Sequence, residues 1–237
     1  MHVERIFNLG STQIAIAAMR RGNIDLYPEY TGTALIDVLH LPPISNPHAA
    51  YAVVARAFRE RYDIVWLDRS PMNDSQALAT TRAGSARYGL ATLSDCARNA
   101  PRLRFATIQE FLARPDGLPG LRRFYGGFRF AEIRTYDIAL KYTALLEGAA
   151  DVASAFSTDG AIATNDLVVL RDDRHFWSAY NVAPVVRAQA LAARPKIADV
   201  LNAVSPRITD RAAQTMNARI EHDQADPADV AAEFLKR

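Results

Sequence analysis

The chain has 237 residues, of which 49% are hydrophobic and 23% charged, a composition typical of a folded globular protein and not of a disordered or fibrous one. Its 28 lysines and arginines face 26 acidic residues, and the net charge of +2 argues against nucleic acid as a partner. No stretch reaches the roughly 20 apolar residues of a membrane span, and the first residues lack the apolar core of a signal peptide.

The first third of the chain is expected to alternate helices and strands. Caps and apolar spacing predict a helix after Ser11 that Gly22 closes, a strand at 24–27, a helix at 34–39, a helix from Asn46 to Arg59 and a strand at 64–67. The small residues at 31–33 follow Pro28 and are expected to form a turn that starts the next helix.

The same alternation continues to the end of the chain. The expected elements are a helix at 95–99 capped by Ser94, a strand at 103–106, a helix at 108–113, a loop at 114–120, helices at 137–146 and 159–164 around a strand at 151–155, a strand at 167–170, and a final helix from Asp226 to Leu235. Strands and helices in this order predict an α/β fold whose sheet is covered on both faces.

The chain offers no constellation typical of an enzyme. Its five histidines, at positions 2, 40, 48, 175 and 222, are too scattered for a metal site, and no phosphate-binding glycine loop occurs. Cys96 stands alone and is expected to be a packed helix residue, and Asp159 is expected to start a helix. We therefore predict neither catalysis nor a metal or other cofactor.

Three aromatic segments lie at expected loops, at 27–33, 156–160 and 175–181. Ligands of α/β proteins bind at such places, and several aromatic faces together attract a bulky cation. From their spacing alone, however, the interpretation of these aromatic residues as ordinary core residues is favoured over a ligand site.

Five segments together resemble substrate-binding proteins of osmoprotectant ABC importers, which take up glycine betaine, choline or carnitine. The segments are GNIDLYPEYTGT at 22–33, DGLPGL at 116–121, AFSTDG at 155–160, DLVVL at 166–170 with acidic residues at 172–173, and YNVAPVVR at 180–187. Their order and intervals extend the resemblance over essentially the whole chain.

The resemblance implies a two-lobed clamshell of the periplasmic-binding-protein type II class. Lobe one would hold residues 1–78 and 182–237, lobe two residues 79–181, with crossovers near 77–81 and 180–184. Members of this family begin with a strand, a ligand loop and a helix that this chain lacks, so we expect a truncated gene or an incomplete gene model.

The resemblance also implies a ligand site. Tyr30, Phe156 and Tyr180 match the aromatic cage for a trimethylammonium group, and Phe156 replaces the usual tyrosine. Gln76 stands where another cage tyrosine is usual. Thr33 and Arg114 match positions that hold the ligand carboxylate, for which a guanidinium group is a natural partner.

The implied function is capture of a quaternary ammonium compound for delivery to an ABC permease in the membrane, without covalent chemistry. The implied location is periplasmic or membrane-associated and extracytoplasmic. Two alternatives stay open: a larger betaine such as ergothioneine, whose polar group Gln76 would contact, and a ligand-sensing or non-functional truncated binding module.

Overall fold

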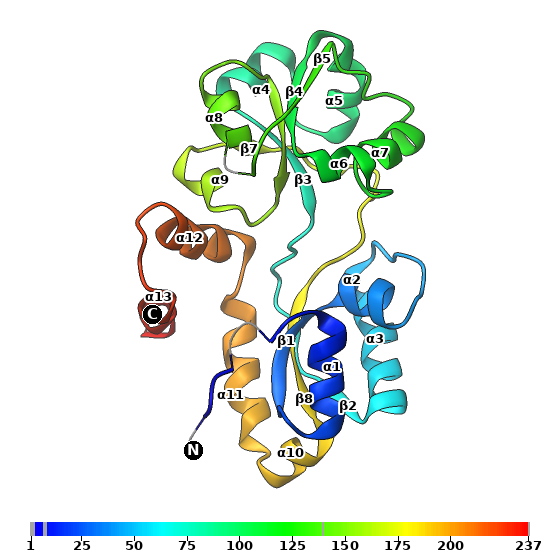
Figure 1. The fold of residues 1–237 in the computed structure, drawn as a ribbon, viewed down its shortest axis with the longest axis vertical. Helices are drawn as coiled ribbons and strands as arrows, with labels where there is room; N and C mark the ends of the chain where they lie inside the picture. Colours follow the sequence, from blue (N-terminus) through cyan, green and yellow to red (C-terminus); the bar gives the residue numbers. More distant parts are fainter. Residues whose placement is uncertain (1–2, 7–8, 139, 237) are drawn as a thin grey trace. The chain divides into compact units, whose positions relative to one another are not determined.

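A computed structural model describes residues 3–6, 9–138 and 140–236. The chain divides into two compact units (Figure 1), and each consists of segments distant in sequence. Unit 1 comprises Met1–Asn73 and Ser178–Thr209, and unit 2 comprises Asp74–Trp177 and Asp210–Arg237.

Unit 1 is built on a three-stranded antiparallel sheet. Its strand order is β1 (Leu26–Tyr30), β8 (Val182–Arg187), β2 (Ile64–Trp66). The helical segments of this unit are α1 (Thr12–Arg21), α2 (Thr31–Thr33), the π-helical turn η1 (Ala34–Val38), α3 (Pro47–Tyr62), α10 (Ala188–Ala193), α11 (Lys196–Val204) and η3 (Ser205–Arg207).

The helices of unit 1 follow the local signals in the sequence. Gly22 ends α1 in the left-handed conformation at φ 77°. The Asn46 side chain accepts hydrogen bonds from the N–H groups of His48 and Ala49, both at 3.0 Å, and so caps α3. Fully buried Met19 and Phe58 then pack these two helices into one core with strand β2.

Unit 2 contains a five-stranded mixed sheet in the order β5 (Glu132–Thr135), β4 (Arg104–Thr107), β6 (Val152–Phe156), β3 (Gln76–Thr80), β7 (Val168–Val169). Strand β4 runs parallel to both its neighbours, whereas β3 runs antiparallel to β6 and β7. Its helical segments are α4 (Arg82–Tyr88), α5 (Leu93–Asn99), η2 (Ala100–Arg102), α6 (Gln109–Ala113), α7 (Leu118–Tyr125), α8 (Leu140–Leu146), α9 (Gly160–Thr164), α12 (Asp210–Glu221) and α13 (Pro227–Lys236).

The two faces of this sheet bury different side chains. Leu78 and Phe105 belong to a core of large side chains, while their strand neighbours Ala77 and Ala106 belong to a second, alanine-rich core. Because successive residues of a strand point to opposite faces, the alternation places one core on each face. The α/β prediction with two covered faces is confirmed for this unit.

The structure corrects three local predictions. Strand β1 begins at Leu26 and runs through Pro28, which is tolerated because β1 is the edge strand of its sheet. Helix α7 begins inside the predicted loop, at Leu118, with Pro119 in the first turn where proline fits. Thr92, not Ser94, caps α5, and it exchanges hydrogen bonds with Asp95 in a capping box.

The carboxyl tail also differs from the expected lobe division. Residues 182–237 were expected to stay together, but the compact units divide them after Thr209. Helix α12 packs on α9 in unit 2, so closely that a β-carbon at Gly160 would lie 2.6 Å from the backbone nitrogen of Ala218. The side chains of Gln214 and Asn217 add hydrogen bonds to the carbonyl groups of Ser157 and Thr158.

Candidate ligand-binding residues

Three of the predicted site residues come from adjoining segments of unit 1. Tyr30 ends strand β1 opposite Val182, and Thr33 ends the following helical turn. The buried Thr31 hydroxyl donates to the Ala179 carbonyl at 2.8 Å and accepts from the Asn181 N–H at 3.1 Å. These bonds fasten the segment that carries Tyr30 to the segment that carries Tyr180.

The Tyr180 ring packs directly against the backbone of Gly32. A β-carbon at position 32 would lie 2.5 Å from Cε1 of Tyr180, a distance that ordinary contacts do not reach. The glycine of the Tyr-Thr-Gly-Thr segment is therefore needed for close approach, because any side chain would displace this ring.

Two asparagines fix the backbone around Tyr180. Asn73 Oδ1 accepts a hydrogen bond from the Tyr180 N–H at 2.7 Å, and Asn181 Nδ2 donates to the Met72 carbonyl at 3.0 Å. Asn181 is 3% exposed, so its hydrogen bond to Met72 is shielded from water. The position of Tyr180 is thus held both by its backbone and by the surface under its ring.

In unit 2, Gln76 and Phe156 face each other across two strands. They are paired residues of the antiparallel ladder between β3 and β6, and both are partly exposed. Residues directly opposite in such a ladder project on the same face of the sheet. The structure therefore places side by side two residues that the family resemblance implied as site residues.

Phe156 lies beside a polar cluster formed by Asp159, Tyr142 and Lys141. Asp159 Oδ2 accepts from the Phe156 N–H at 3.0 Å and from the Tyr142 hydroxyl, and it lies 3.6 Å from the Lys141 ammonium nitrogen. Burial raises the pKa of Tyr142 and lowers the pKa of Lys141, while the nearby Asp159 carboxylate opposes the shift of the lysine. Asp159 does precede helix α9 as expected, but its carboxylate binds these groups instead of the helix N–H groups.

Arg114 follows α6 and already engages a carboxylate of its own loop. Its Nε and Nη2 atoms donate to the two oxygens of Asp116 at 2.8 and 2.7 Å. The Asp116 carbonyl in turn accepts from the indole N–H of buried Trp177 at 2.8 Å. Strands β4 and β6 are parallel, so their carboxyl ends lie at the same edge of the sheet. Helix α6 follows β4 at this edge, and Phe156 is the last residue of β6.

No sequence pattern indicated several residues that shape these positions. Lys141 and Tyr142 lie on α8, far in sequence from Phe156, and were seen only as helix residues. Asn73 precedes the predicted crossover, where an amide has no distinctive pattern. Gly32 was identified only as part of a motif, because the lack of room for a side chain at this position is a property of the fold.

Among the described residues, no group of three histidine, cysteine, aspartate or glutamate side chains is placed to hold a metal ion. Cys96 is fully buried on α5, as predicted, and burial raises the pKa of its thiol. Within the same described ranges, no helix combines the length and apolar character needed to cross a bilayer.

Comparison with known proteins identifies the family. Residues 1–237 match the family described as the substrate-binding domain of the ABC-type glycine betaine transport system. The chain is 34% identical to the glycine-betaine-binding protein of Pseudomonas aeruginosa over 96% of its own length and 76% of that protein. It is 28% identical to an ergothioneine transport permease and binding protein of Helicobacter pylori, over 99% of its own length and 42% of that protein.

A solved structure shows the same fold. The crystal structure of a glycine betaine/carnitine/choline ABC transporter protein superimposes with a TM-score of 0.91 and 33% identity, covering 97% of this chain and 84% of the other. The expected type II periplasmic-binding-protein fold is thereby confirmed. Proteins of this family bind small solutes outside the cytoplasm for ABC permeases. The chain belongs to the family of substrate-binding domains of ABC-type glycine betaine transport systems.

Proposed function

We propose that this protein is the solute-binding component of an ABC importer and captures a quaternary ammonium compound such as glycine betaine or choline. The match of the whole chain to the substrate-binding family carries this proposal. A permease in the membrane is its partner, its site of action is extracytoplasmic, and it performs no covalent chemistry.

The proposed ligand contacts are Tyr30, Thr33 and Tyr180 of unit 1 and Gln76, Arg114 and Phe156 of unit 2. Support comes from the geometry within each unit. Tyr180 rests on Gly32, two positions from Tyr30, and Gln76 pairs with Phe156. Aromatic faces held in place attract a cation without the cost of ordering them first.

A larger betaine such as ergothioneine is the second candidate, because position 76 carries an amide. Gln76 lies beside Phe156 and can offer both a donor and an acceptor there. The relative in Helicobacter pylori, whose name includes ergothioneine binding, supports this alternative.

Thermal unfolding in the presence of single ligands tests the proposal. Glycine betaine, choline, carnitine or ergothioneine should raise the unfolding temperature in a concentration-dependent way, since a ligand of the native state stabilises it by mass action. Sugars and unmethylated amino acids serve as controls. The absence of stabilisation by every quaternary ammonium compound would contradict the proposed function.

A further inference from the structure

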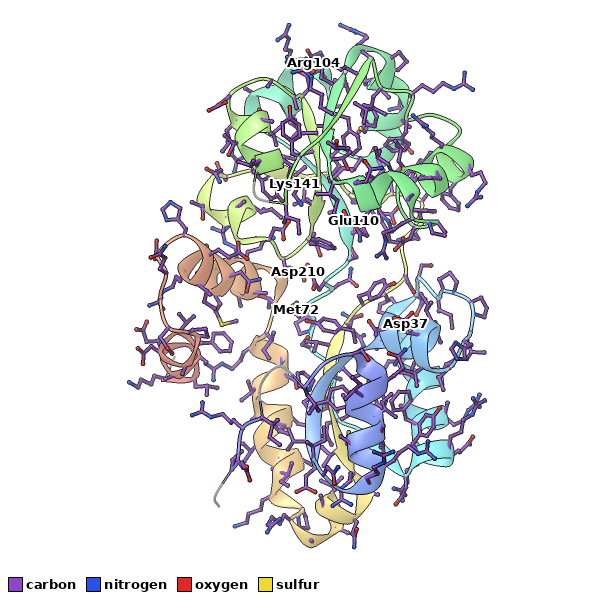
Figure 2. The ribbon with its side chains drawn as sticks, viewed as in Figure 1. Asp37, Met72, Arg104, Glu110, Lys141 and Asp210 are labelled. Atoms are coloured by element: carbon purple, nitrogen blue, oxygen red, sulfur yellow. The ribbon has the colours of Figure 1, made fainter. Side chains whose placement is uncertain are left out.

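Lys141 places a buried positive charge directly against a predicted wall of the site. The residue, labelled in Figure 2, is only 1% exposed. Its ammonium nitrogen lies 5.5 Å from the centre of the Phe156 ring and 4.8 Å from the centre of the Tyr142 ring. Cation–π attraction operates at these distances. One aromatic ring of the site thus already interacts with a cation of the protein itself.

The same ammonium group is paired with the main carboxylate of the cluster. Asp159 Oδ2 lies 3.6 Å from Lys141 Nζ, and the more exposed Glu221 of α12 adds a weaker negative field. With the lysine charged, the Lys141–Asp159 pair carries no net charge. Without the lysine, a partly buried negative charge would remain beside Phe156.

A ligand cation on the opposite face of Phe156 would feel this charge. Cation–π contacts reach about 6 Å from the ring centre, and Lys141 Nζ lies 5.5 Å from that centre on its own side, so the ligand cation would lie no more than about 12 Å from the ammonium nitrogen. Solvent screens only part of an interaction over that distance when one of the charges is buried.

We propose that Lys141 is a specificity-determining residue that lowers the affinity for simple quaternary cations and thereby favours zwitterionic betaines. It does so by neutralising Asp159 and by contacting the Phe156 ring with its own positive charge. Choline has a net positive charge and is therefore penalised, whereas a betaine also carries a carboxylate that Lys141 attracts. This inference rests on the proposed function and names a determinant of its selectivity.

The test compares Lys141→Met with the wild type and with Lys196→Met. Methionine is similar in length and uncharged, and Lys196 is an exposed lysine on α11, so both variants lose the same formal charge. Titration calorimetry should show choline binding three- to tenfold tighter in Lys141→Met, about the effect of one charge at this range. Glycine betaine should tighten less, and Lys196→Met should leave both affinities unchanged.

A second variant separates charge from packing. Asp159→Asn removes the negative partner and leaves the ammonium uncompensated, so choline binding should weaken while Lys141→Met strengthens it. Lys141→Arg retains the positive charge and should therefore show the wild-type ratio of choline to betaine affinity. A purely structural role would instead weaken both ligands in every variant, together with a lower unfolding temperature.

The affinities of the wild type and the two variants separate the role of Lys141 from the proposed function. An unchanged or lower ratio of choline to betaine affinity in folded Lys141→Met would overturn the role of Lys141 while the proposed function stands. A wild type that binds neither choline nor any betaine would overturn both. If Lys141→Met does not fold, the prediction for Asp159→Asn still applies, and unchanged or tighter choline binding there contradicts the proposal.

Discussion

The ring of Tyr180 lies against Gly32 so closely that a β-carbon on residue 32 would approach Cε1 of Tyr180 to 2.5 Å. The contact joins two segments 148 residues apart in sequence, and the Thr31 hydroxyl bond to the Ala179 carbonyl fastens the same segments. The position of a predicted cage residue therefore depends on the absence of a side chain elsewhere.

Gly32→Ala is expected to displace the Tyr180 ring. The extra carbon costs about 1–3 kcal/mol of stability, as overpacking usually does, and weakens binding of glycine betaine. Urea unfolding and titration of Gly32→Ala, Tyr180→Ala and the double variant form the measurement. If the contact is responsible, the alanine at position 32 costs much less stability once the ring is gone. Strictly additive effects would show that the strain lies elsewhere.

Gln76→Tyr is expected to tighten glycine betaine by about 0.5–2 kcal/mol, because it adds an aromatic face beside Phe156. For ergothioneine the same change removes an amide, and we expect weakening by about 1–3 kcal/mol if that amide contacts the ligand. Calorimetric titration of glycine betaine and ergothioneine against the wild type and Gln76→Tyr distinguishes a missing aromatic face from a ligand-contacting amide. Unchanged affinities for both would place Gln76 outside the site.

Arg114→Ala is expected to weaken carboxylate-bearing betaines by roughly 2–4 kcal/mol and choline much less. For this role the guanidinium must bind the ligand in addition to, or in place of, Asp116, which now accepts two of its hydrogen bonds. Asp116→Asn is the matched control, because it removes the carboxylate charge that pairs with Arg114 and keeps the arginine itself. An equal loss for choline and betaine in Arg114→Ala would mean that the residue only supports its loop.

The pair formed by Asp151 and Arg104 predicts a pH dependence of stability. Burial alone would raise the pKa of Asp151, but hydrogen bonds from the Arg104 side chain and backbone outweigh it and lower the pKa below its usual range. Arg104 is labelled in Figure 2. The pair therefore contributes its full stability above the unfolded-state pKa of about 4, and this contribution is lost as pH falls through the lower folded-state value.

Urea unfolding between pH 7 and pH 3 tests this dependence. Asp151→Asn should be less stable than the wild type at pH 7 by about 1.5–3 kcal/mol, typical of hydrogen bonds to a charged group. The difference should shrink as pH falls from about 4 toward 3, because the unfolded wild type takes up a proton at Asp151 before the folded wild type does. A difference that stays constant across this range would contradict the assignment.

Local signals predicted much of the fold, and tertiary packing decided the rest. Asn46 before Pro47 and Gly22 after α1 specify their helix ends through bonds to neighbouring residues, so the sequence alone predicts them. The predicted bounds of strand β1 were wrong because Pro28 is tolerated inside the strand only where that strand lies at the edge of its sheet, and no local pattern reveals this position. Helix α12 was expected in the other lobe. Its packing on α9 depends on the space at Gly160, which is a property of the folded chain and not of a local pattern.

The candidate site shows the same division. Tyr30, Phe156 and Tyr180 stand in motifs that a family resemblance can align, whereas the spacing of the aromatic residues alone favours an interpretation as core residues. Lys141 has no such motif, because its relevance comes from lying 5.5 Å from the Phe156 ring centre in the folded chain. A family resemblance therefore aligns candidate residues that stand in motifs, but it does not single out a residue such as Lys141, which is linked to them only by packing in the folded chain.

The central claim, recognition of a quaternary ammonium group, is tested most directly by titrating the wild-type protein with matched methylated and unmethylated ligands. Glycine betaine against glycine and choline against ethanolamine differ only in the methyl groups of the cation. The account predicts saturable heat of binding for the methylated member of at least one pair and none for its unmethylated counterpart at the same concentration. Equal binding of both members of each pair would contradict it, and so would binding of neither pair when carnitine and ergothioneine do not bind either.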